Sequence, residues 1–514
     1  MSDTVVETKI CPISWESFTI TQNDRDFYAK ISPIFAGQQF AIPTPRLSPQ
    51  ERQRRRLAFR NERNLYKRTC DASGKQIISI YSPDKSYKVY DQKIRWSDSR
   101  DPMDYGRDFD FSKTFAENFH SIILDVPRYN LYNFDNYNSD YVQYLPHSQN
   151  CYLVFGWRYC KDCLYGWTLM ECNDCVDCLY TDKCDHCYEC IDCLRCHSCY
   201  YLFNCSDCSF SYYLEHCKWC QFCYNCSGLH NQKYCIDNTQ YTKEDYLHRI
   251  GSLLWNHISR PERHITKMMI QEHCENCIWN FLYNSRNIFH CDQSWDSEDI
   301  RYSMRFAEQK DSMDIYGSAK GSLLYDCLCC DYNHDCLFGF DSEYCTHSLY
   351  FDHCFHSDNV FWCIGLRHKS YCIFNKQYSK EDYELTVARI ISHMQETCER
   401  WEFLHRSLSP FGYNETVAQE YYPLEKWDLG EFGYRWSDYD APKPVSDKVI
   451  KWQDLPNTID EVHDDILQYA IACEVTGKLF RIQPQELVFY RKHHIPVPRK
   501  HPDQRHLERL VLRK

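Results

Sequence analysis

The clearest pattern along the chain is a three-residue period in its cysteines. Nineteen cysteines lie between Cys151 and Cys235, and every gap between neighbours is three, six or nine residues. A strand repeats its side-chain direction about every two residues and an α-helix about every 3.6, so neither keeps such a frame on one face. The period predicts a backbone that turns a corner every few residues and points one residue in three inward. We therefore expect a narrow β-solenoid with a cysteine-lined core over residues 151–241.

A second ladder of cysteines follows the first. It runs from Cys327 to Cys372 at a constant step of nine residues, and Cys291 fits the same frame. The ladders also end alike, because CSGLHNQKYCIDNTQYTKEDY, which starts at Cys226, matches CIGLRHKSYCIFNKQYSKEDY, which starts at Cys363. Matched residues differ by 137 in number throughout. This internal duplication predicts a second solenoid over residues 276–378.

Each ladder ends in a helix-start signal. Thr242 and Ser379 are N-cap candidates, and each is followed three residues later by an aspartate. Because the last coil of a solenoid exposes unpaired backbone groups, we expect helical caps at residues 242–275 and 379–470, the second continuing into an irregular connector. Cysteine steps of nine and of twelve both occur, which leaves two coil lengths open, twelve and eighteen. Asp or Asn often precedes a cysteine, and these turn-forming residues favour corners at this interval.

The two ends of the chain carry one motif. The N-terminal part reads CPISWESFTITQNDRDFYAK from Cys11 and, after an insertion, IPTPRLSPQER. The C-terminal part reads CEVTGKLFRIQPQELVFYRK from Cys473 and then IPVPRKHPDQR. Both resemble a family of small, treble-clef-like zinc-ribbon modules, whose pattern is Cys-x-x-Cys, a Phe-x-Phe/Ile strand, Glu-x-x-Phe-Tyr and Pro-Arg-x-Cys-x-x-Cys-Arg. The resemblance implies such a module with a basic helix at residues 1–85, a connector at 86–150, and a second module at 471–514.

The metal-ligand positions of that family are eroded in this chain. They hold Cys11, Ser14, Ser48 and Glu51 at one end, and Cys473, Thr476, His501 and Gln504 at the other. Structural zinc needs four Cys or His ligands in a closed tetrahedron. We therefore expect the ribbon shape to persist at both ends, without a zinc ion at both, and Cys473 and His501 are the remaining candidate ligands.

The chain as a whole is similar to Cys-repeat proteins of small-genome bacteria of the candidate phyla radiation. The similarity rests on the ladder ending GL…YC…N.QY.KE.Y and on the segment ERxRRRLAFRNERxLYKR. It implies the architecture and no activity.

Charge is distributed unevenly along the chain. The net charge is −13, whereas residues 46–75 carry +7 and residues 491–514 carry +6, which leaves −26 on the body between and around them. Basic ends indicate an anionic partner such as RNA or DNA, and docking of the ends on the acidic body is the alternative. The candidate phosphate contacts are Arg52, Arg54, Arg55, Arg56, Arg60, Arg63, Lys67, Arg68, Arg499, Arg505 and Arg509.

The cysteines have a metal-binding and a structural interpretation. Cys-x-x-Cys spacing occurs in zinc and iron–sulfur sites, and the candidate ligands in the first ladder are Cys172, Cys175, Cys184 and Cys187. Buried cysteine also packs as a small apolar residue. We favour packing, because an unbroken run of three-residue steps suits a stack better than separate four-ligand cages. Phosphate-binding glycine loops, a nucleophile elbow and a zinc-protease helix are absent from the sequence.

Together these patterns predict a mainly β fold: two tandem Cys-lined β-solenoids with helical caps, flanked by small degenerate zinc-ribbon-like modules. The sequence contains no long apolar run and no signal-peptide pattern, so we expect a cytoplasmic protein, with reduced thiols and no membrane association. The expected function is a non-enzymatic scaffold or interaction protein that contacts RNA, DNA or a protein partner, with zinc as the cofactor considered. A metal-thiolate (zinc or copper) storage or sensing protein and an iron–sulfur redox protein are the alternatives. The sequence leaves the oligomeric state open.

Overall fold

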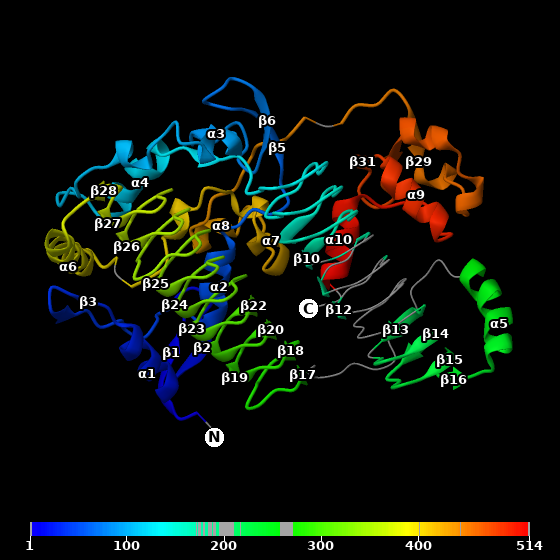
Figure 1. The fold of residues 1–514 in the computed structure, drawn as a ribbon, viewed down its shortest axis with the longest axis horizontal. Helices are drawn as coiled ribbons and strands as arrows, with labels where there is room; N and C mark the ends of the chain where they lie inside the picture. The colour runs from blue at the N-terminus through cyan, green and yellow to red at the C-terminus, as the bar shows by residue number, and fades with distance from the viewer. Residues whose placement is uncertain are drawn as a thin grey trace. The chain divides into compact units, whose positions relative to one another are not determined.

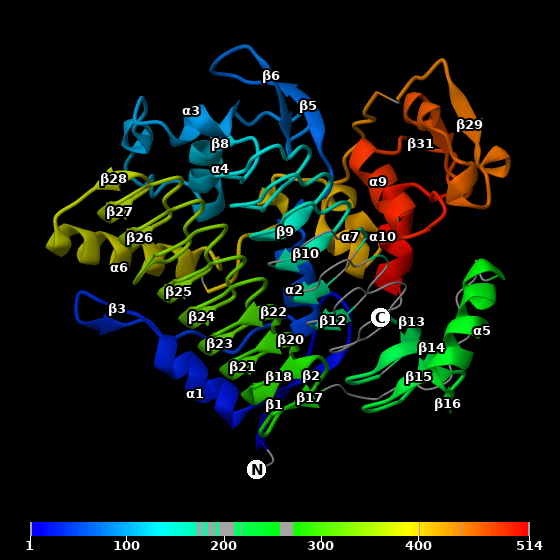
Figure 2. The same ribbon diagram turned by 45° about the vertical axis from the view of Figure 1, so that its right-hand side comes forward.

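The chain forms two compact units, each built from two segments that are far apart in the sequence. Unit 1 comprises residues 1–130 and 268–439, and unit 2 comprises residues 131–267 and 440–514. The computed structural model (Figures 1 and 2) describes residues 3–170, 172, 176–177, 180–182, 188, 192–194, 210–215, 217–256, 271–399, 401–442 and 444–511. The fold is mainly β, as the sequence predicts, and its largest element is a β-solenoid.

The first segment of unit 1 contains short strands and helices. They are β1 (Val5–Ile10), β2 (Ser17–Thr21), α1 (Gln22–Ile31), β3 (Ile34–Phe35), β4 (Gln38–Gln39), α2 (Pro49–Leu57), β5 (Tyr66–Thr69), β6 (Gln76–Ser79), β7 (Val89–Tyr90), α3 (Gln92–Trp96), the 3-10 helix η1 (Pro102–Tyr105), α4 (Phe115–Asp125) and β8 (Arg128–Tyr129). The basic segment is helical over α2 alone, because its later part, β5, pairs with β6 as an antiparallel hairpin.

The second segment of unit 1 contains the second coil run, residues 271–377. Its strands are β17 (Gln271–Glu272), β18 (Leu282–Tyr283), β19 (Arg286–Phe289), β20 (Asp292–Trp295), β21 (Glu298–Arg301), β22 (Met304–Ala307), β23 (Lys310–Met313), β24 (Ser322–Tyr325), β25 (His334–Leu337), β26 (Asp358–Phe361), β27 (Ser370–Ile373) and β28 (Lys376–Gln377). It is followed by α6 (Lys380–Glu396), η2 (Arg406–Leu408), η3 (Tyr413–Glu415), α7 (Val417–Tyr421) and α8 (Leu429–Phe432). Figures 1 and 2 both show α6 beside the last coils, where its buried face packs through residues such as Tyr383 and Ile390.

Unit 2 contains the first coil run, whose described parts lie between Tyr137 and Gln240, and the C-terminal segment. The coil run includes β9 (Phe155–Arg158), β10 (Trp167–Met170), β11 (Tyr180–Asp182), β12 (Asp192–Leu194), β13 (Tyr212–Glu215), β14 (Gln221–Ser227), β15 (Lys233–Ile236) and β16 (Thr239–Gln240), followed by α5 (Lys243–Asn256). The C-terminal segment has β29 (Val449–Lys451), η4 (Trp452–Asp454), η5 (Ile459–Glu461), η6 (Asp464–Gln468), β30 (Ala470–Ala472), β31 (Leu479–Phe480), α9 (Pro484–Lys492) and α10 (Pro502–Val511). The parallel pairing starts at Tyr137, ahead of the first cysteine of the ladder.

Each regular coil takes twelve residues and turns four corners, which explains the three-residue period. Ser322 pairs in parallel with His334, and Phe155 pairs with Trp167, each partner lying one coil further along the chain. Every third residue has a positive φ, and in both ladders this corner residue directly precedes the inward one: Asp162 (φ 56) precedes Cys163. A nine-residue step is three residues, or one side, short of a full twelve-residue coil. Each cysteine of the second ladder therefore lies one corner back from the cysteine before it. The first coil of the second run is one residue shorter, because Gln271 pairs with Leu282, and its opening cysteines are therefore out of frame with those that follow.

The two coil runs end in the same local structure, at the positions that the internal duplication predicts. In each, a parallel strand (β15 or β27) turns back into a short antiparallel strand (β16 or β28). A helix then begins after Thr242 or Ser379, whose hydroxyl accepts the N–H of the aspartate three residues later at 3.1 Å. The match between Cys226–Tyr246 and Cys363–Tyr383 is therefore confirmed. Helix α5 is described as far as Asn256, and the second coil run begins at Gln271.

Candidate functional site: the cysteine core and the arginine clusters

Inward side chains complete the backbone hydrogen bonding of the coils. Two backbone N–H groups in each three-residue step donate hydrogen bonds to neighbouring coils. The Gln149 N–H donates to the Cys160 carbonyl, and the Asp162 N–H donates to the Gln149 carbonyl, both at 2.9 Å. The N–H of the inward residue is satisfied differently. Where the inward residue one coil earlier is Ser, Asn or Cys, the N–H donates to that side chain, as Cys160 does to Ser148 Oγ at 3.0 Å. Small side chains with an acceptor atom therefore satisfy backbone groups of the core at these positions, whereas other inward positions, such as Ile288, Ile300 and Val360, are apolar.

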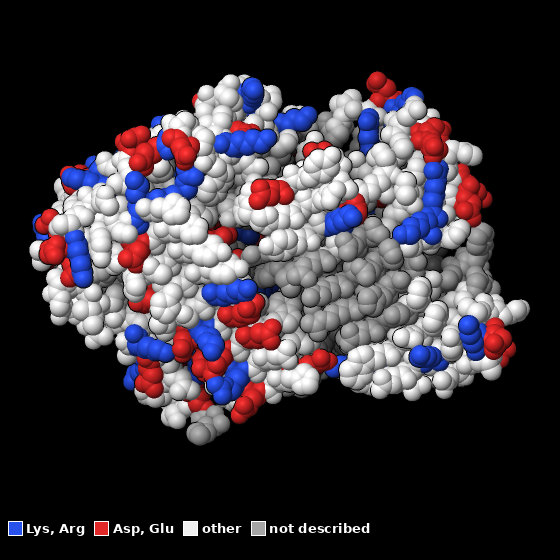
Figure 3. Space-filling view, in the orientation of Figure 1, with Lys and Arg blue, Asp and Glu red and all other residues white. Residues whose placement is uncertain are grey.

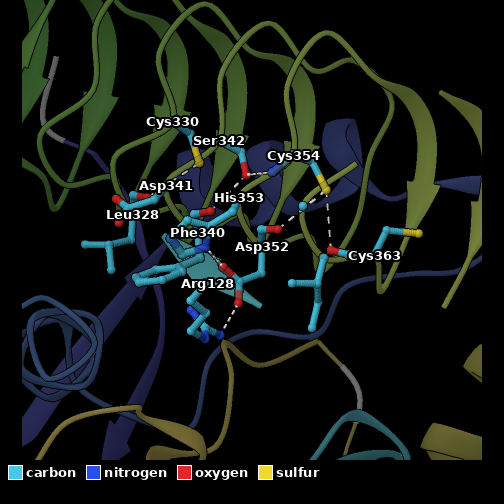
Figure 4. Close-up of polar contacts among 12 residues, drawn as sticks. Arg128, Leu328, Cys330, Phe340, Asp341, Ser342, Asp352, His353, Cys354 and Cys363 are labelled. Carbon is cyan, nitrogen blue, oxygen red and sulfur yellow. Dashed lines mark hydrogen bonds and ion pairs between the residues drawn. The ribbon is translucent and has the colours of Figure 1, made fainter. Parts of the chain in front are cut away.

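The same side chains donate a hydrogen bond back to the coil. Cys354 Sγ lies 3.6 Å from the carbonyl oxygen of Asp352 and 3.4 Å from that of Cys363, as Figure 4 shows. Ser342 Oγ, one coil earlier, donates to the Phe340 carbonyl at 2.8 Å and accepts the Cys354 N–H at 2.9 Å. Cysteine and serine thus occupy one structural position, and cysteine adds apolar volume to a narrow core.

The described thiols of the ladders are buried, but their pKa values are shifted in both directions. In the first run, hydrogen bonds from Cys217 and Cys223 lower the pKa of Cys220 to about 3, and a hydrogen bond from Cys223 lowers that of Cys226. Inward burial is confirmed for Cys151, Cys160, Cys163, Cys172, Cys217, Cys220, Cys223, Cys226 and Cys235. The side chains of Cys175, Cys178, Cys184, Cys187, Cys190, Cys193, Cys196, Cys199, Cys205 and Cys208 lie outside the described residues. In the second run, burial raises the pKa of Cys345 to about 12 and that of Cys354 well above 9.0. These two thiols are therefore not nucleophilic near neutral pH.

The predicted metal ligands are not gathered into a site by the described part of the chain. Cys172 is fully buried in the first coil run, whereas Cys175, Cys184 and Cys187 lie outside the described residues. His501 Nδ1 accepts the N–H of Asp503 at 3.1 Å, in the first turn of α10. In the ranges that the structure describes, no group of three or more His, Cys, Asp and Glu side chains is arranged to hold a metal ion.

Cys11, Cys70 and Cys473 occupy three copies of one tight turn. In each copy the cysteine N–H donates to the carbonyl five residues later, at 2.8–3.0 Å. Burial raises the thiol pKa, but hydrogen bonds from the backbone and from a Ser or Thr hydroxyl outweigh it and lower the pKa of all three. Two of these donors, the side chain of Ser14 and the N–H of Ser48, belong to eroded ligand positions around Cys11. Those positions therefore still converge on the cysteine, as hydrogen-bond donors.

Helix α2 docks on the second coil run through buried ion pairs. The side chains of Arg52, Arg55 and Arg56 in α2, and of Arg60 just after it, are all at most 7% exposed. Their carboxylate partners are Asp314, Asp326 and Asp341 of the coils, with Arg52 Nε 2.8 Å from Asp314 and Arg55 Nη2 2.7 Å from Asp326. This geometry is the alternative considered for the basic segment, a charged helix that docks on the acidic body.

The remaining basic candidates are mostly engaged as well. Arg54 pairs with Glu51 at 2.7 Å, and the buried Arg68 donates to backbone carbonyls, including that of Tyr87 at 2.6 Å. Arg63 and Arg499 are half-buried, and Lys67 is exposed. On the face drawn in Figure 3, basic and acidic side chains of the described residues are interspersed rather than separated.

Helix α10 docks on the first coil run in the same way. Arg505 Nη1 lies 2.5 Å and Arg509 Nη2 3.3 Å from the carboxylate of Asp177, and all three side chains are buried. The Arg505 guanidinium also lies over the ring of Tyr165, 4.8 Å from its centre. Tyr165 in turn donates to Glu486 of α9 at 2.7 Å.

The two docking sites share five equivalent contacts. The coil residues of unit 1 and unit 2 differ by 137 in number throughout, and the terminal residues are those that the end motif aligns. The matched contacts are Arg52–Asp314 with Arg505–Asp177, Arg56–Asp314 with Arg509–Asp177, Arg52–Tyr302 with Arg505–Tyr165, Tyr28–Tyr325 with Tyr490–Tyr188, and Tyr302–Asp24 with Tyr165–Glu486. The duplication therefore includes the docking of the ends on the coils.

Sequence reasoning missed the acceptors of these arginines. Asp177 (φ 62) and Asp314 (φ 65) are corner residues, and aspartate is among the few residues that adopt this left-handed conformation readily. Because aspartate is expected at a corner for conformational reasons alone, its presence at these positions is no separate reason to expect an ion pair. The available signal was that the two aspartates occupy matching positions of the duplication, combined with a pair of arginines one helical turn apart at each end of the chain.

A second buried network holds the connector before the first coil run. Asp352 accepts from Arg128 Nη2 at 2.6 Å and contacts the Nδ1 atom of His353, as Figure 4 shows. Burial raises the pKa of Asp352, but Arg128 and His353 outweigh it and hold the pKa below 3.8. This network ties β8 to the second coil run within unit 1.

One corner of the second coil run carries a column of partly exposed rings. Tyr332, Tyr344, His356 and His368 lie on successive coils and stack with ring centres 4.5–4.9 Å apart and planes within 10°. Their spacing matches the separation of neighbouring coils. Desolvation and the neighbouring His368 lower the pKa of His356 below 6.5.

Comparison of the chain with protein-family models, curated proteins and solved structures finds no significant match. Among the described residues, no helix has both the length and the apolar character needed to cross a bilayer.

Proposed function

We propose that this protein is a non-enzymatic scaffold made of two copies of one module–solenoid unit. Each copy has a solenoid of twelve-residue coils, a capping helix and a docked terminal module of degenerate zinc-ribbon type. The zinc-ribbon origin is supported by the shared tight turn at Cys11 and Cys473 and by the convergence of the former ligand positions on those thiols. A scaffold of this kind offers a protein partner rigid, repetitive surfaces such as the ring column.

The observation that carries the scaffold proposal is the hydrogen bonding of the core thiols. In the described second run, Cys327, Cys336, Cys345, Cys354 and Cys363 each lie 3.3–3.5 Å from a coil carbonyl nine residues later. Thiols that donate to coil carbonyls in this way serve the structure of the core. Metal storage and redox catalysis both need thiolates.

Metal content and thiol reactivity of the purified chain test the proposal. A structural core predicts a metal content near zero and 34 titratable thiols after unfolding, with the ladder thiols unreactive in the native protein. Several zinc or copper ions per chain would favour storage, and iron with sulfide would favour a redox protein. The exposed Cys398 serves as an internal control, because it should react in the native state.

Nucleic-acid binding by the basic ends stays a prediction. A gel-shift titration at low salt tests it, with Arg54, Arg55 and Arg56 changed together to Gln as the comparison. Phosphate contacts would give steeply salt-dependent binding that the triple variant weakens for all sequences alike. The buried ion pairs instead lead us to expect a lower melting temperature in the variant and no binding by either protein.

A further inference from the structure

The docking site on each coil run is built for a recognisable kind of occupant. We propose that it is a recognition site for a module of this type, and that the site on the first coil run accepts, in trans, the C-terminal module of a second copy of this chain together with the segment from Val449 that precedes it. The proposal rests on the two-copy architecture proposed above.

The occupant is defined by three contacts that converge on neighbouring corners. Asp177 takes two guanidinium groups, Tyr165 lies under one of them, and the hydroxyl of Tyr165 binds a carboxylate of the module. An ammonium group cannot reproduce the planar donor geometry and ring stacking of arginine. A carboxylate without its two arginines would be a buried, unpaired charge, so the site discriminates against other occupants.

The equivalence of the two sites shows that the recognition belongs to the surfaces and not to one chain connection. The N-terminal module precedes both coil runs, and the C-terminal module follows both, yet each forms the same five contacts. The same docking contacts thus form whether the module is connected to the chain before the coils or after them. A third connection, to another molecule, changes none of the contacts.

The tether of the C-terminal module lies apart from its docking surface. Residues 440–442 and 444–448 have no helix or strand and are largely exposed, and β29 begins at Val449. A tether of about nine residues reaches about 30 Å when extended. Tethering of this kind gives an effective concentration on the order of millimolar, so docking in cis prevails until the tether is cut or the protein is very concentrated.

The test uses the full chain with a protease recognition sequence in place of residues 441–445. After folding and cleavage, the C-terminal fragment should co-elute with the remainder in gel filtration. When cleaved protein is mixed with a fluorescently labelled cleaved preparation, label should pass to the unlabelled remainder. Immediate release of the fragment would overturn the docking site, and retention without label exchange would overturn docking in trans.

Substitutions at the coil surface test the contact set. Asp177→Ala should release the fragment after cleavage, whereas Asp162→Ala, which removes a corner aspartate bound by Asn150 at 2.7 Å, should not. If Asp177→Ala fails to fold, Arg509→Lys replaces it and should increase the dissociation rate of the fragment about tenfold or more, which is about 1.4 kcal/mol. Unchanged retention in both variants would refute the recognition role. The metal and thiol measurements do not depend on docking, so a failure here is distinguishable from a failure of the scaffold proposal.

Discussion

Removal of a single corner carboxylate should destabilise one unit selectively. Asp314→Ala leaves Arg52, which is 2% exposed, with the Leu47 carbonyl at 2.8 Å as its remaining hydrogen-bond acceptor in the described region, while Arg56 keeps Asp326. Leaving one buried charge without its partner costs about 3–5 kcal/mol. In unit 2, Asp177 serves both Arg505 and Arg509, so we expect Asp177→Ala to lie at or above the upper end of that range.

These free energies translate into measurable melting shifts. Unfolding entropy is about 2.1 cal/mol/K per residue, so unit 1, with about 300 residues, has a total near 0.6 kcal/mol/K. A loss of about 3–5 kcal/mol then lowers its melting temperature by about 5–8 °C. Unit 2 has about 210 residues, and a loss of about 5 kcal/mol lowers its melting temperature by about 11 °C.

Differential scanning calorimetry of the full chain provides the measurement. Each substitution should move the transition of its own unit and leave the other in place, and Asp162→Ala should move neither by more than about 2 °C. Replacing Asp314 by Leu together with Arg52 by Met should recover most of the loss, because apolar residues of similar size substitute for a buried ion pair. A shift below about 1 °C for Asp314→Ala, or an equal shift of both transitions, would refute the assignment of these ion pairs to separate units.

Three further predictions concern the coils of unit 1. Ser342→Ala should cost about 1–3 kcal/mol in urea unfolding because it leaves the Cys354 N–H without an acceptor, and Ser342→Cys should recover most of that loss; equal stability of the two variants would contradict the shared role of serine and cysteine. Gly339→Ala places a Cβ 2.5 Å from Phe351 and should cost about 1–3 kcal/mol, whereas Gly430→Ala, with open space around it, should be neutral or slightly stabilising by the same assay. Asp352→Asn should be destabilising above pH 3.8, where the carboxylate is ionised in both the native and the unfolded protein. The difference from the unchanged protein should shrink as the pH falls from 3.8 through the lowered native pKa, and a difference that is constant with pH would argue against an ionised Asp352.

The coil architecture was predictable because its period is written in one residue type. Cysteine marks the inward frame in both ladders, and Asp or Asn marks corners such as Asp162 and Asn225, both with positive φ. The coil length was not predictable from spacing alone, since a step of nine is equally a step around the core. Serine completes the frame in the second run at positions such as Ser342, where its polarity gives no sign in the sequence that the side chain points inward.

The docking arginines could be found in the sequence, but their partners could not. A basic helix in an acidic protein is compatible with a nucleic acid or with the protein itself, and the energy that separates the two depends on tertiary burial. Arg56 and Asp314, both fully buried, are 258 residues apart along the chain. No local pattern contains a contact of that separation, although the matching positions of Asp177 and Asp314 in the duplication carried the information.

The interleaving of the two units has a consequence for synthesis on the ribosome. Residues 1–130 of unit 1 emerge before the whole of residues 131–267, and only then does the segment on which they dock begin to appear. Unit 2 in turn waits for residues 440–514. Neither unit can close before the other has begun, although domains usually fold in order as they are made. A premature stop anywhere in residues 440–514 therefore leaves residues 131–267 without the segment that completes unit 2, whereas unit 1 already has all of its residues.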